Sequence, residues 1–104
     1  MERGGRADEA GAMTPDRAFG RALRAVRTER GLSQEGLAFD AGYDRSYISL
    51  LENGRYSPSL NAIFRLARAL AVRPSALLAR AEDAVDTLPG RARADDGDTS
   101  DDRD

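Results

Sequence analysis

Cysteine, histidine, tryptophan and lysine are all missing from this chain of 104 residues. Without cysteine or histidine the chain has no disulfide, no thiolate nucleophile, no imidazole base and no ligands for an ordinary structural zinc site. No apolar run approaches the ~18 residues of a membrane span, and the N-terminus lacks the apolar core of a signal peptide. We therefore expect a soluble, cytoplasmic protein with no metal and no cofactor.

Motifs of catalysis are also missing. Neither GxGxxG nor GxxxxGK[ST] occurs, so the chain has no glycine-rich phosphate loop. The C-terminal DDGDTSDDRD lacks a closing glutamate at the spacing of a calcium loop. We expect a protein that is not an enzyme.

Charge is distributed unevenly along the chain. The net charge is −2, but residues 15–80 hold 11 arginines against 6 acids, whereas residues 82–104 hold 9 acids against 3 arginines. The charge pattern predicts three segments: a disordered N-terminal tail at 1–13, a folded basic domain at 14–86, and an acidic disordered tail at 87–104.

Residues 34–53, QEGLAFDAGYDRSYISLLEN, contain the most informative pattern. Leu37, Ala38 and Ala41 fall on one face of a short helix, and Ile48 and Leu51 form the inward face of a second one. Gly42 lies between them and can adopt a positive φ, and Asp44 after it is a good helix N-cap. Two short helices joined by a short turn containing glycine form a helix-turn-helix, here at 33–53.

Three further helices complete an all-α, five-helix bundle. One begins at the Thr14 cap and Pro15, ends at Gly31, and has the apolar stripe Phe19, Ala22, Leu23 and Val26. Another follows the Ser59 cap, and its expected core stripe is Leu60, Ile63, Leu66, Ala67 and Leu70. The last begins at Pro74 and ends near residues 81–85, with two leucines expected to point inward, Leu77 and Leu78.

These residues resemble the phage-repressor and Cro class of helix-turn-helix proteins, the XRE family. The matching residues are Gln34, Ala38, Gly42 and Ile48, followed by LEN at 51–53, with GLSQE, PSL and LARAL in the flanks. The resemblance covers roughly residues 19–79, and DRSYIS at 44–49 is most similar to small controller proteins, including those of restriction-modification systems. It implies a compact domain of the phage-repressor type in a bacterial or phage regulator of transcription.

The resemblance also implies roles for individual residues. Gln34, beside Ser33 at the start of a helix, contacts a phosphate and braces the recognition helix, and Arg27 forms a structural ion pair with Glu52. Arg45 and Ser46 meet base edges. Arg45 can bind the O6 and N7 atoms of guanine, with a phosphate contact as the alternative.

Other residues of the recognition helix, 44–53, have open roles. Asp44 is a cap or accepts from a cytosine, Tyr47 contacts a phosphate or packs, and Ser49 is a minor contact. Leu50 touches a thymine methyl or a partner surface. The following loop is expected on the sugar–phosphate backbone through Asn53, Gly54, Arg55 and Ser57.

The expected partner is double-stranded DNA, bound at a two-fold symmetric operator by a homodimer that pairs through the fifth helix. No membrane contact is expected. A protein partner for the acidic C-terminal tail is a further prediction. The alternative function is a helix-turn-helix module for protein interaction, such as an antitoxin or an adaptor.

Overall fold

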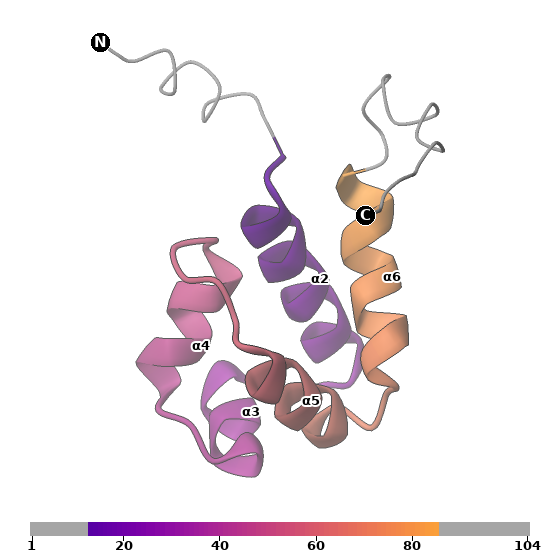
Figure 1. Ribbon diagram of the computed structural model, residues 1–104. Helices are drawn as coiled ribbons and strands as arrows, with labels where there is room; N and C mark the ends of the chain where they lie inside the picture. Colours follow the sequence, from indigo (N-terminus) through magenta and orange to yellow (C-terminus); the bar gives the residue numbers. More distant parts are fainter. Residues whose placement is uncertain (1–12, 86–104) are drawn as a thin grey trace, which may run out of the picture.

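Five α-helices form the described part of the chain, residues 13–85 of the computed structural model (Figure 1). No strand occurs within these residues, which confirms the all-α prediction. The predictions for both tails lie outside them, apart from Met13, which packs against the core. The helices are α2 (Pro15–Glu29), α3 (Gln34–Ala41), α4 (Arg45–Glu52), α5 (Leu60–Ala69) and α6 (Pro74–Val85).

Three of the helices begin where a hydroxyl side chain caps them. Thr14, Ser33 and Ser59 each have an extended backbone and accept a hydrogen bond from the amide three residues on. Each cap satisfies one of the amide groups that the first turn of a helix leaves without a partner. The caps fix where α2, α3 and α5 start, as the sequence predicts.

Four helices end on a residue in the left-handed region. The φ angles are +73° at Gly31, +79° at Gly42 and +74° at Gly54, conformations that glycine adopts without a Cβ penalty. Ala71, with φ +60°, occupies the same place after α5. Its carbonyl accepts a hydrogen bond from the Arg30 guanidinium at 3.2 Å, which ties this turn to the end of α2.

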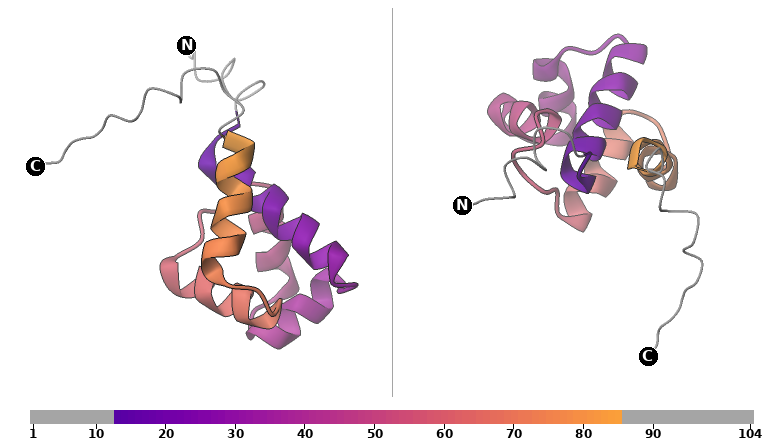
Figure 2. Two further views of the ribbon diagram at one scale, coloured as in Figure 1. Left: turned by 90° about the vertical axis from the view of Figure 1, so that its right-hand side faces the viewer. Right: turned by 90° about the horizontal axis from the view of Figure 1, so that it is seen from above.

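The core lies where the helices meet around α2. In Figure 1, α2 lies between α4 on one side and α6 on the other, and α3 and α5 close the lower end. The further views in Figure 2 show α6 running beside α2. The largest fully buried side chains come from all five helices: Leu23, Leu37, Ile48, Leu51, Leu66, Leu70 and Leu77.

Two leucines expected in the core are exposed. Leu60 is 68% exposed because it is the first residue of α5, which contacts the core one turn later through Ala62 and Leu66. Leu78 is 42% exposed because α6 faces the core through Leu77 and Ala81. The residue after Leu77 is rotated by about 100° around the helix. The prediction was wrong for Leu60 and Leu78.

Helices α2 and α4 cross at Gly20. A Cβ atom on Gly20 would lie 2.6 Å from the carbonyl oxygen of Glu52 and closer still to that of Leu51. Glycine costs about 1 kcal/mol relative to alanine inside a helix. Here its missing side chain lets the end of α4 rest directly on α2.

Candidate nucleic-acid interface

Helices α3 and α4 pack against each other across the turn at Gly42. Ala38 and Ala41 of α3 and Ile48 of α4 are buried, so the small side chains let the two helices approach closely. The Tyr43 amide donates to the Ala38 carbonyl at 2.8 Å, which closes the end of α3 before α4 begins. This arrangement is a helix-turn-helix.

The outer face of α4 is polar. Arg45 and Ser46 are exposed, whereas Ser49 and Leu50 are half-buried. Ile48 and Leu51 hold the opposite face in the core with no exposed area. The helix therefore presents its first turn to solvent while its other side is fixed.

Asp44 precedes α4 with the extended backbone of an N-cap, but its side chain makes no cap hydrogen bond. Its Oδ2 instead accepts from the Ser46 hydroxyl at 2.7 Å. The expected carboxylate cap is therefore replaced by a bond to a side chain on the same turn, which leaves the exposed Asp44 and Ser46 held together.

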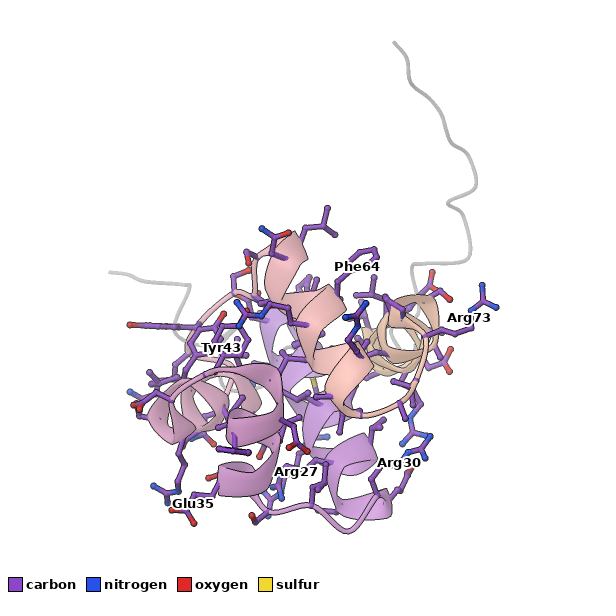
Figure 3. All side chains as sticks on the ribbon, turned by 90° about the horizontal axis from the view of Figure 1, so that it is seen from below. Arg27, Arg30, Glu35, Tyr43, Phe64 and Arg73 are labelled. Atoms are coloured by element: carbon purple, nitrogen blue, oxygen red, sulfur yellow. The ribbon has the colours of Figure 1, made fainter. Side chains whose placement is uncertain are left out.

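Glu52, at the end of α4, joins three helices. Its carboxylate accepts from Arg27 on α2 through Nε (2.6 Å) and Nη2 (3.0 Å), and from the Gln34 amide on α3 at 3.0 Å. The side chains of Arg27 and Glu52 are only 11% and 3% exposed. Arg27 also donates to the Leu32 carbonyl at 2.8 Å, and its inward direction is visible in Figure 3. The hydrogen bond to Glu52 raises the pKa of Arg27 above its usual value.

Three tyrosine rings and an arginine line one side of the motif. The Tyr43 and Tyr47 ring centroids are 4.8 Å apart, and the edge-on Tyr47 and Tyr56 centroids are 6.1 Å apart. The Arg65 guanidinium of α5 lies 4.5 Å from the Tyr43 ring centroid. Burial, followed by the proximity of Tyr43, raises the pKa of the Tyr47 hydroxyl, which therefore remains a neutral hydrogen-bond donor.

The loop after α4 is open to solvent. Asn53, Arg55 and Ser57 are exposed. Gly54 turns the chain with its positive φ, and a Cβ there would come within 2.7 Å of the Arg17 side chain. The loop therefore lies against the start of α2 and presents its polar side chains beside α4.

The structure brings the predicted residues into two groups. Arg45, Ser46 and Ser49 share the outer face of α4, and Ser33, Gln34 and the loop residues lie near its two flanking segments. Sequence reasoning missed Gly20 and Arg65. A glycine inside an otherwise regular helical stripe was a usable signal for Gly20, but the contact of Arg65 with Tyr43 depends on how α5 packs.

The fold and this geometry define the class: a helix-turn-helix protein whose second helix exposes a polar face. A family model described as Helix-turn-helix matches residues 23–77, more than half of the chain. The chain belongs to this family, the XRE-type DNA-binding regulators of transcription. None of the helices in residues 13–85 is long and apolar enough to cross a membrane.

Similar proteins include repressors and controllers. The immunity repressor protein of Bacillus phage phi105 is 41% identical over 59 residues, which cover 57% of this chain and 41% of the repressor. Control protein C.BamHI of Bacillus amyloliquefaciens is 41% identical over 61 residues, covering 58% and 75% of the two chains. This chain thus spans less than half of the phage repressor but three quarters of the control protein.

Solved structures share the fold. The restriction-modification controller protein C.AhdI from Aeromonas hydrophila superposes with a TM-score of 0.58 at 49% identity, covering 59% of this chain and 92% of its own. The clp gene regulator ClgR from Corynebacterium glutamicum gives a TM-score of 0.69 at 27% identity, covering 71% and 79%. These relatives are named as regulators rather than enzymes.

Proposed function

We propose that the protein is a sequence-specific regulator that binds a two-fold symmetric operator as a homodimer, with α4 in the major groove. The observation that carries the proposal is the placement of Arg45 and Ser46 on the exposed first turn of a helix whose other face is buried. A helix held in this way enters a major groove as a rigid element, and its N-terminal residues reach the base edges.

The second part of the proposal concerns affinity. Ser33 and Gln34 lie at the start of α3, and Asn53, Arg55 and Ser57 follow α4. We assign these five residues to the sugar–phosphate backbone, where contacts fix register without reading sequence. Tyr47, whose neutral hydroxyl lies on a half-buried ring, is assigned to the same group, and Asp44 is assigned to orienting Ser46.

Selection of bound sites from random duplex DNA, followed by a salt titration on the winner, tests the proposal. We expect a two-fold symmetric motif with half-sites about one helical turn apart. Affinity should fall steeply as salt rises because bound cations are released from the phosphates. The absence of an enriched motif would reject specific operator binding.

Arg45→Ala is expected to reduce discrimination for one base pair of each half-site by about 1–3 kcal/mol. The reason is that Arg45 can form two hydrogen bonds to a guanine only from the exposed first turn of α4. The measurement is the affinity for the selected operator and for single-base variants of it.

Arg55→Ala is the matched control, because it removes the same charge from the adjacent loop. It should weaken binding to all sequences alike and lower the salt slope by about 1. If Arg45→Ala also weakens all sequences alike, Arg45 binds a phosphate and does not read a base.

The pairing surface is proposed on α5 and α6. Leu60 and Phe64 lie four residues apart on one face of α5, and they are 68% and 55% exposed. Figure 3 shows Phe64 pointing away from the bundle. Leu78 adds a 42% exposed leucine on α6, the helix through which pairing was predicted. Exposed apolar side chains of this size are typical of a surface covered by a partner.

Phe64→Glu is expected to shift the protein from dimer to monomer in sedimentation experiments, because a carboxylate buried in an apolar interface lacks a partner. Operator affinity should fall with it, since one half-site supplies fewer contacts. Phe39→Glu is the control, because Phe39 on α3 is 85% exposed and lies outside this surface. A dimer that survives Phe64→Glu would place the pairing surface elsewhere.

One observation supports the alternative function, a module for protein interaction. Phe39 is the most exposed large hydrophobic residue in the described part of the chain, and it lies beside two exposed acids, Glu35 and Asp40. Phosphates repel such a face, whereas a protein with a basic rim matches it. Loss of function through Phe39→Ser with unchanged DNA binding would favour this alternative.

A further inference from the structure

Arg65 lies on α5, outside the helix-turn-helix, but both of its described contacts are with the turn of that motif. Its guanidinium carbon lies 4.5 Å from the centroid of the Tyr43 ring, a distance suited to a cation–π interaction. Its Nη2 donates to the Gly42 carbonyl at 3.4 Å. Figure 3 shows Tyr43 on the side of the motif that faces α5.

The turn is shaped to receive this arginine. A Cβ atom on Gly42 would lie 2.5 Å from Arg65 Nη2, so any other residue at position 42 would displace the guanidinium. Glycine at this position therefore serves two purposes: it adopts φ +79°, and it leaves room for Arg65.

The contact continues into the recognition helix. Tyr43 packs on Tyr47 of α4, with ring centroids 4.8 Å apart, and Tyr47 packs edge-on against Tyr56 in the loop after α4. At the other end of α4, Glu52 is bonded to Arg27 and Gln34. The start of α4 has no comparable bond from its cap, since the Asp44 carboxylate is bonded to Ser46.

We propose that Arg65 is a positioning residue for DNA recognition, which fixes the start of α4 through its contacts with Tyr43 and Gly42 and does not itself touch DNA. The inference rests on the proposed function. A recognition helix held at both ends is already in its binding arrangement, whereas one held only at Glu52 must be ordered on binding, which lowers affinity.

The test compares Arg65→Met with Arg68→Met, which removes the same charge one turn further along the exposed side of α5. Operator affinity, affinity for random DNA and the salt slope are measured at a temperature at which circular dichroism shows each variant to be folded. Arg65→Met should bind the operator about fivefold more weakly, the factor that a cation–π contact of ordinary strength represents. Arg68→Met should bind as the parent protein does.

The salt slope separates positioning from phosphate binding. A lost phosphate contact lowers the slope by about 0.9, whereas lost positioning leaves it unchanged. Tyr43→Phe keeps the ring face and should retain affinity, whereas Tyr43→Leu should reproduce the loss. The double variant Arg65→Met/Tyr43→Leu should be no weaker than either single variant, because both remove one interaction. Unchanged operator affinity, a lower slope or additive losses would overturn the inference.

Amide hydrogen exchange without DNA provides the second measurement. Arg65→Met should speed the exchange of the Tyr43, Tyr47 and Ile48 amides, which close the turn and the first turn of α4, and leave α2 and α6 unchanged. If the parent protein selects no operator, the proposed function fails, and the exchange rates still decide whether Arg65 holds the turn. Equal exchange in both proteins would show that it does not.

Discussion

Replacing Arg27 by alanine is expected to lower the free energy of unfolding by about 3–5 kcal/mol, because it leaves the Glu52 carboxylate buried without its cation. The Glu52 side chain is 3% exposed and receives two of its three described hydrogen bonds from Arg27. The Leu32 carbonyl loses its donor as well. Urea unfolding followed by circular dichroism is the measurement.

The exposed ion pair of Arg80 with Glu29 provides the control within the same molecule. These side chains are 43% and 57% exposed, and pairs of this kind contribute about 0–1 kcal/mol. Arg80→Ala should therefore unfold close to the parent protein. A double variant, Arg27→Met/Glu52→Met, should be more stable than either single variant, because it removes the charge with its partner. Equal losses from Arg27→Ala and Arg80→Ala would contradict the structural role of the buried pair.

The same ion pair bears on function because it positions α4. Arg27 and Gln34 hold the last residue of the recognition helix against α2 and the start of α3. A folded fraction of Arg27→Ala should consequently bind the proposed operator more weakly than random DNA contacts alone would explain. Stability and recognition share Glu52.

The helices were predictable from sequence because their ends are local. Thr14, Ser33 and Ser59 cap the residues that follow them, and Gly31, Gly42 and Gly54 adopt left-handed angles within their own turns. Such signals need only neighbouring residues. The buried faces of α2, α3 and α4 followed for the same reason, since helical spacing alone places their apolar residues on one side.

Side-chain placement at the edges of the domain was not predictable in this way. Leu60 and Leu78 continue apolar stripes, yet they are exposed because α5 and α6 contact the core over only part of their length. Arg65 reaches Tyr43 across 22 residues of sequence, and no local pattern marks that contact. The choice between a cap and a bond to Ser46 for Asp44 was likewise decided by side-chain geometry.

Gly20→Ala is expected to destabilise the protein by about 3 kcal/mol, because the added Cβ would overlap backbone atoms that cannot rotate away. It would lie 2.6 Å from the Glu52 carbonyl oxygen and closer to that of Leu51, so α2 and α4 would have to separate. The gain of about 1 kcal/mol that alanine brings inside a helix is too small to offset this. The measurement is the midpoint of urea unfolding.

Gly36→Ala is the matched control, since Gly36 is also a glycine inside a helix. A Cβ there would lie 3.3 Å from the Ser33 hydroxyl and 3.7 Å from a Leu32 methyl, both side-chain atoms that can shift by a few tenths of an ångström. Its helical gain of about 1 kcal/mol therefore remains largely intact, and the variant should be at least as stable as the parent protein. If both alanine variants were stable, α2 and α4 would not be in backbone contact. The close crossing that places the recognition helix on α2 would then be incorrect.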